Sequence, residues 1–271
     1  MAAGGLGAIE QSNLRQIEAL NQRGGRTLSI VDVMQAGTIT PEAAGFLLWR
    51  VAHGASFLAG AVPGGAGKST LLADLLAMLP PGERIVTTPD DDAVRQALRE
   101  KSRRGRCYLC HEIGSGMWYG YLWGATVGRF LGLAEQGGRI AGCLHADDPV
   151  QMRGMLLSPT LGVTREAFGR LGILLFMAFD RSAFRGSRVV DSIWMADGQG
   201  DHRLAYKREG ELRGSDWVGA LNGDQAPPCL GTCQTFMREL AEGSAHLFEE
   251  VRKATIGFYA TTTKPEGGVS C

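Results

Sequence analysis

Short apolar runs alternate with longer amphipathic stretches through the middle of this chain. The apolar runs have the length of buried strands, and the stretches between them have the spacing of helices. The expected strands are 55–62, 84–88, 106–111 and 139–145, and the expected helices are 69–79, 91–101, 119–136, 149–157 and 164–171. Strands that alternate with helices predict a parallel sheet covered by helices on both faces.

The pattern changes after residue 172, where three strand-like runs follow one another without a helix between them. These runs are 173–180, 188–195 and 202–208. Consecutive strands predict an antiparallel extension, so the expected fold class is α/β with a mostly parallel sheet and an antiparallel end. Beyond it we expect an irregular stretch over 214–229, one closing amphipathic helix over 234–254 and a disordered tail over 261–271.

The N-terminal part of the chain is expected to form short helices over 13–21, 29–35 and 41–53. Ser29 and Thr40 have side chains that cap helix N-termini, and Pro41 suits a first helical position. The predicted organisation is a short helical segment at 1–50, a core at 51–215, and an irregular segment, helix and tail at 216–271.

Composition adds a few limits. The 271 residues are 44% hydrophobic, which is enough for a sizeable core. Acidic and basic residues balance at 28 each, so we expect no direct nucleic-acid partner. The first residues lack a basic region followed by an apolar stretch, and no apolar run is a convincing membrane span. We therefore expect a cytoplasmic protein.

The six cysteines allow two interpretations. Cys107 and Cys110, read together with Cys229 and Cys233, have spacings that a zinc site can use. Metal-binding pairs of this kind usually lie on turns, whereas 106–111 has the pattern of a strand. The sequence therefore favours reduced, buried thiols on strands over a metal site.

The clearest chemical motif is a glycine-rich loop between the first expected strand and the helix after it. Its residues are Pro63, Gly64, Gly65, Ala66, Gly67, Lys68, Ser69 and Thr70. Glycines let backbone N–H groups turn inward around phosphates, and the helix N-terminus favours their negative charge. Lys68 would reach the β- and γ-phosphates and the Ser69 hydroxyl would hold Mg²⁺, which predicts ATP with Mg²⁺ as ligands. Val62 stands where the motif has its first glycine, a position that need not touch phosphate.

Two further residues follow strands at the same expected sheet edge. Glu112 ends the run Tyr108-Leu109-Cys110-His111-Glu112, and its carboxylate would polarise the attacking water. His145 follows Leu144 and would sense the γ-phosphate or couple it to a neighbouring subunit. The alternatives are a surface carboxylate for Glu112 and a structural histidine for His145. His111 is expected to be structural.

The ordered set of motifs resembles the secretion ATPase family, which drives type II and type IV secretion and the assembly of type IV and tight-adherence pili. The resemblance covers about residues 26–210 and rests on the loop at 62–70, Glu112, Leu144 with His145, and a Gly-x-Arg-x-Val pattern at 186–190. It implies a RecA-like P-loop fold and an ATP-hydrolysing subunit. It further implies a ring-shaped homo-oligomer such as a hexamer, and a membrane-embedded partner that would hold the chain at the inner membrane.

The sequence departs from that family at three places. The stretch 87–92 lacks the family's catalytic Glu and holds Asp90, Asp91 and Asp92, which we interpret as helix-capping residues rather than as substitutes. The Arg expected after Glu112 is absent, and only about 50 residues precede the first expected strand. Two alternatives therefore stay open: a nucleotide-binding regulator with weak or no hydrolysis, and a small-molecule P-loop kinase.

Other groups have two interpretations each. The basic run 101–106 is either a trans-acting arginine finger or, as we slightly favour, a solvated turn. The same ambiguity applies to Arg181, Arg185 and Arg188. The aromatic residues Trp118, Tyr119, Tyr121 and Trp123 are expected on a helix, as core or subunit interface rather than as an adenine site.

Overall fold

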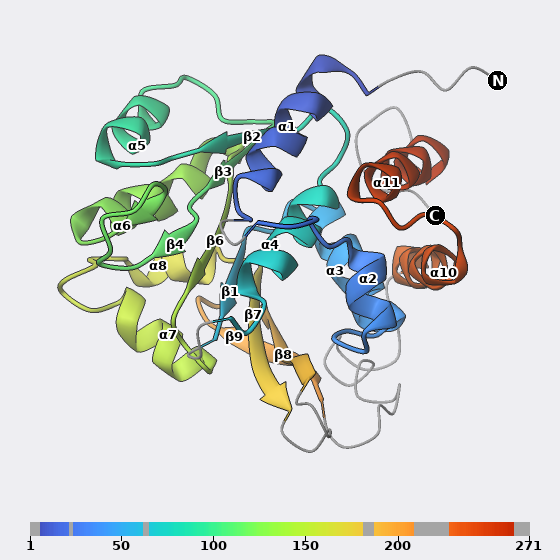
Figure 1. Ribbon diagram of the computed structural model, residues 1–271. Helices are drawn as coiled ribbons and strands as arrows, with labels where there is room; N and C mark the ends of the chain where they lie inside the picture. The colour runs from blue at the N-terminus through green and yellow to red at the C-terminus, as the bar shows by residue number, and fades with distance from the viewer. Residues whose placement is uncertain (1–5, 22–23, 62–64, 181–186, 209–227, 263–271) are drawn as a thin grey trace.

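The computed structural model describes residues 6–21, 24–61, 65–180, 187–208 and 228–262. Helices pack on both faces of a central sheet (Figure 1). Its strands are β1 (Phe57–Gly60), β2 (Arg84–Thr87), β3 (Arg106–Leu109), β4 (Glu112–Ile113), β5 (Tyr121–Leu122), β6 (Arg139–Leu144), β7 (Ile173–Asp180), β8 (Ser187–Ala196) and β9 (His202–Lys207). The helices are α1 (Ala8–Glu18), α2 (Ile30–Gln35), α3 (Pro41–Ala52), α4 (Lys68–Ala77), α5 (Asp91–Leu98), α6 (Ala125–Leu131), α7 (Pro149–Leu156), α8 (Arg165–Gly169), α10 (Pro228–Glu242) and α11 (Phe248–Thr262), with a 3₁₀ segment η1 (Gly132–Gly137).

The sheet order is β2-β3-β6-β1-β7-β8-β9, with the short strands β4 and β5 beside β6. The strands from β2 to β7 run parallel, and β8 and β9 continue the sheet in antiparallel pairing. One strand, β6, lies between β1 and β3, which is the RecA-like order. The predicted fold class is confirmed, and each strand expected from the apolar pattern is present within a few residues of its predicted bounds.

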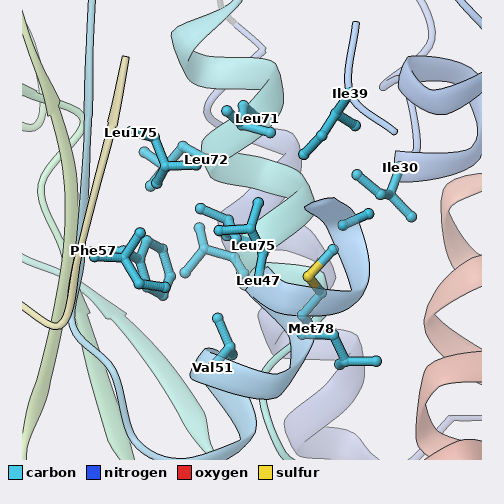
Figure 2. Close-up of a cluster of buried hydrophobic side chains, with 14 of the residues drawn as sticks. Ile30, Ile39, Leu47, Val51, Phe57, Leu71, Leu72, Leu75, Met78 and Leu175 are labelled. Carbon is cyan, nitrogen blue, oxygen red and sulfur yellow. The ribbon is translucent and has the colours of Figure 1, made fainter. Parts of the chain in front are cut away.

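Alternate residues of β1 face opposite layers of the core. Phe57 packs on the side of α3 and α4, and Figure 2 shows Leu47 and Leu75 on that side of its ring. Leu58 belongs to the buried cluster of the α5–α8 side. The first cluster also takes residues from α1, α2, α10 and α11. Because β1 is buried on both faces, the end of this strand is a rigid place from which to start a loop.

The predicted long helix over 119–136 is wrong. Gly120 and Gly124 have φ angles of +79° and +63°, values that interrupt a right-handed helix. The segment instead forms β5, then α6 from Ala125, and ends in η1, where Gln136 has a φ of +57°. The apolar spacing resembled a helix, but the glycines determine where the chain turns.

The single helix predicted over 234–254 is also wrong, because the chain forms α10 and α11 there, with a break between Glu242 and Phe248. Thr261 and Thr262 belong to α11, so the prediction of a disordered tail fails at these two residues. The rest of that tail lies outside the described residues. The stretch 214–229, which was predicted to be irregular, also lies outside the described residues up to residue 227. Residues 228 and 229 are helical.

The N-terminal helix α1 begins at Ala8, earlier than predicted, and lies along the outer edge of β2. The Asn13 amide donates to the carbonyl of Glu83 and accepts from the N–H of Ile85, both at 2.8 Å. Glu10 receives a hydrogen bond of 2.8 Å from Arg252 of α11. Both N-terminal caps are confirmed, since Ser29 and Thr40 accept from backbone N–H groups of the helices that follow them.

Cys107, Cys110, Cys143 and Cys233 are buried and free. For Cys107 and Cys110 this is the state that the strand interpretation of 106–111 predicted. Burial raises the pKa of the Cys107, Cys110 and Cys143 thiols, and it raises the pKa of Cys233 to about 12. These thiols therefore stay protonated at neutral pH. Within the described ranges no three His, Cys, Asp or Glu residues gather as a metal site would require.

Candidate functional site

The glycine loop leads from β1 into α4, which begins at Lys68. Val62, Pro63 and Gly64 lie outside the described residues. Gly65 and Gly67 have φ angles of +84° and +100°, a region that glycine reaches without strain. A side chain at Gly67 would also lie 3.0 Å from the methyl carbon of Met177. The N–H groups of the first turn of α4 point out of the helix end, where they can receive an anion.

Lys68 is 8% exposed and points back toward the end of β1. Its ammonium donates to the carbonyl of Ala61 at 3.1 Å and lies 3.2 Å from Nδ1 of His145. It is also 3.8 Å from Oε1 of Glu112. Lys68 therefore contacts two of the other predicted site residues, Glu112 and His145.

Glu112 begins β4 and is 7% exposed. Its Oε1 lies 3.2 Å from Nε2 of His145. Nδ1 of His145 lies 3.2 Å from the ammonium of Lys68 and 3.2 Å from the carbonyl of Ala61, so the imidazole ring is held between the end of β1 and the carboxylate of Glu112. The structure thus brings Lys68, Glu112 and His145 together from three different elements, which is the arrangement expected from their positions in the sequence.

These groups line one cavity of about 430 Å³. One end is formed by residues 65–70, with Glu112 and His145 beside them. Ser69 is exposed to the cavity and Thr70 is half-buried. His111, Tyr121 and Arg188 also contribute to the lining. Arg188 lies near the loop, with its Cδ 3.5 Å from where a Cβ of Gly67 would be, whereas Arg181 and Arg185 fall outside the described residues.

The other end of the cavity was missed by the sequence analysis. It is lined by Ile17, Leu20, Asn21, Gly24, Arg26, Thr27 and Leu28. These residues belong to the end of α1 and to the segment that leads into α2. No chemical motif marks them, because their role depends on α1 lying against β2 and α4, which the amino-acid pattern does not specify.

The acidic trio after β2 caps a helix, as predicted. Asp90 accepts a hydrogen bond of 2.9 Å from the N–H of Ala93 at the start of α5. Asp91 receives hydrogen bonds from Arg95 and Arg129, and these lower its pKa to about 2. Neither carboxylate lines the cavity.

The interpretation of 101–106 as a solvated turn is wrong for Arg103, which is 4% exposed. Its guanidinium donates to the carbonyls of Ala97, Leu98 and Glu135. It thus satisfies carbonyl groups at the end of α5 within its own chain.

None of the four aromatic residues lies on a helix: Tyr121 belongs to β5, and Trp118, Tyr119 and Trp123 lie in the loops on either side of it. Trp118, Tyr119 and Trp123 are 66%, 63% and 43% exposed. His111 is buried behind the loop before β5, and the N–H groups of both His111 and Glu112 donate to the carbonyl of Gly120. The backbone of this loop is therefore hydrogen-bonded directly to Glu112, whose carboxylate lines the cavity.

Comparisons with known proteins give only distant similarities. No family model matches the chain, and no curated protein does. Among solved structures, the VirB11 ATPase of the Brucella suis type IV secretion system is similar at 18% identity and a TM-score of 0.44, covering 73% of this chain and 58% of that one. The Legionella pneumophila ATPase DotB is similar at 17% identity and a TM-score of 0.41, covering 82% of this chain and 59% of that one.

The chain thus spans less than two thirds of either ATPase, and at this identity neither similarity assigns an activity. The VirB11 ATPase is a type IV secretion ATPase, which is the class of protein that the motifs of this chain resemble. Among the helices that the structure describes, none combines the length and the apolar character needed to cross a bilayer.

Proposed function

We propose that this chain is an ATP-binding and ATP-hydrolysing subunit of a secretion or pilus-assembly type of machine. The observation that carries the proposal is the convergence of Lys68, Glu112 and His145 on one cavity at the N-terminus of α4. A polyphosphate fits this end of the cavity, because the lysine, the first-turn N–H groups and Arg188 all favour negative charge.

In this proposal Lys68 exchanges its contacts with Ala61 and His145 for the β- and γ-phosphates. Ser69 would hold Mg²⁺, which would supply positive charge beside the phosphates when bound. Glu112 orients a water molecule and accepts its proton while the water oxygen attacks the γ-phosphorus and the bond to ADP breaks. His145, released by Lys68 but still beside Glu112, reports on the presence of the γ-phosphate.

Replacing Glu112 by glutamine tests the hydrolytic part of this proposal. The amide keeps the size of the side chain but cannot take a proton, so phosphate release should fall about 10²- to 10⁴-fold while ATP affinity changes little. The measurement is phosphate release at saturating Mg-ATP, together with a binding titration. Glu100→Gln is the matched control, because Glu100 bonds Arg106 and Tyr108 away from the cavity. Equal phosphate release by Glu112→Gln and the wild-type chain would remove Glu112 from the mechanism.

A nucleotide-binding regulator with weak or no hydrolysis is the second candidate. It is favoured by the positions of Asp90 and Asp91, which lie where the secretion ATPases have a catalytic Glu. Asp91 is held by two arginines and Asp90 caps a helix, so neither carboxylate assists at the cavity. Tight ATP binding by the wild-type chain with no phosphate release would select the regulator.

The machine-like role further implies a ring that acts on a membrane-embedded partner. We expect the mass of the chain in solution to rise to that of a closed ring, such as a hexamer, when a non-hydrolysable ATP analogue and Mg²⁺ are added. Light scattering coupled to size exclusion measures this, with the Lys68→Ala chain as the control that cannot respond. A monomer under both conditions would contradict the motor and favour the regulator.

A further inference from the structure

The unassigned end of the cavity has a different chemistry from the phosphate end. Ile17 and Leu20 belong to the core and reach the cavity only with the 1% and 5% of their surfaces that are exposed. Leu28 is 41% exposed although it is a large apolar side chain that lines the cavity. Asn21 and Thr27 add hydrogen-bonding side chains to the same wall. The cavity therefore has a cationic end at the glycine loop and an apolar end beside α1.

This wall is held in place by its own contacts. The Asn21 amide donates to the carbonyl of Gly25 at 3.0 Å. Arg26 makes a bidentate pair with Asp32 at 2.7 and 2.8 Å, and Asp32 also completes the capping box of α2. Since the chain on either side of Leu28 is already fixed, a ligand that packs on it incurs little ordering cost.

We propose that Ile17, Leu20, Asn21, Thr27 and Leu28 form the subsite for the nucleoside part of the triphosphate. The base would pack on the aliphatic side chains, while Asn21 and Thr27 would meet polar atoms of the base edge or the ribose. This inference rests on the proposed function for the phosphate end, because the glycine loop fixes where the triphosphate begins. It assigns to the N-terminal helix a binding role that no motif in the chain indicates.

The test compares Mg-ATP with Mg-tripolyphosphate, which has the phosphates but no nucleoside. We expect the wild-type chain to bind ATP at least about tenfold more tightly than tripolyphosphate. Leu28→Asn, which keeps the size of the side chain and adds no charge, should weaken ATP binding about tenfold and leave tripolyphosphate binding unchanged. Calorimetric titration of each ligand into each full-length chain gives the four dissociation constants.

Leu204→Asn is the matched control, because Leu204 is 39% exposed on β9 and does not line the cavity. It should leave both affinities at wild-type values. The subsite is overturned if wild-type ATP binding is no tighter than tripolyphosphate binding, or if Leu28→Asn weakens both ligands equally. If tripolyphosphate fails to bind while ATP binds, the phosphate site is overturned, and the subsite falls with it because it is placed relative to the glycine loop. If neither ligand binds the wild-type chain, both proposals fail.

Discussion

Replacing Lys68 by alanine is expected to weaken ATP binding about 10- to 100-fold and to abolish turnover, because hydrogen bonds to charged groups contribute about 1.5–3 kcal/mol each. In the structure the ammonium of Lys68 lies 3.8 Å from Glu112 and 3.2 Å from His145, and the residue begins α4. Its removal takes away the charge that would meet the β- and γ-phosphates. Fluorescence titration with a labelled ATP analogue and a phosphate-release assay measure the two effects.

Lys207→Ala serves as the control for this change. Lys207 also pairs with a carboxylate, Asp191, at 2.6 Å, but it lies on β9 and does not line the cavity. Its loss should leave both ATP affinity and turnover near wild-type values. ATP turnover that persists unchanged in Lys68→Ala would exclude the glycine loop as the site of catalysis.

The second large effect is expected for stability. Arg252→Met should lower the free energy of unfolding by about 3–5 kcal/mol, because it leaves a buried carboxylate without its cation. Arg252 is 2% exposed; it donates to Glu10 of α1 and to the carbonyls of Ala77 and Leu79 at the end of α4. One guanidinium thus joins α11, α1 and α4. Urea unfolding followed by circular dichroism measures the loss.

The exposed pair between Arg238 and Glu42 supplies the comparison, since its side chains are 49% and 39% exposed. Arg238→Met should cost no more than about 1 kcal/mol. Adding Glu10→Gln to Arg252→Met should recover part of the lost stability, because the double variant no longer buries an unpaired charge. A loss in Arg252→Met as small as that in Arg238→Met would mean that the buried network does not stabilise the fold.

The sequence predicted the sheet well because β1, β3, β6 and β7 are apolar runs that local composition identifies. It also placed the phosphate loop, Glu112 and His145 at one edge, since parallel strands end on the same side of a sheet. These conclusions need only the order of elements along the chain.

The remaining features depend on contacts between distant segments. The helix predicted across residue 120 failed because the apolar spacing of that stretch is compatible with a helix, whereas Gly120 and Gly124 adopt positive φ. The apolar end of the cavity was missed because Leu28 has no distinguishing neighbours in sequence. Leu28 follows α1 in the chain, and the position of α1 depends on its packing on β2 and on the bond between Glu10 and Arg252, a residue more than two hundred positions away.

The amide of Asn13 has a consequence for how copies of this chain can assemble. Its bonds to the carbonyl of Glu83 and the N–H of Ile85 occupy two outward-facing backbone groups at the start of β2, the terminal strand of the sheet. An uncovered terminal strand is a template on which a neighbouring molecule can add a strand of its own. Here the Asn13 amide already holds part of that edge, so a strand added at β2 by a neighbouring copy of this chain would have to displace Asn13 first.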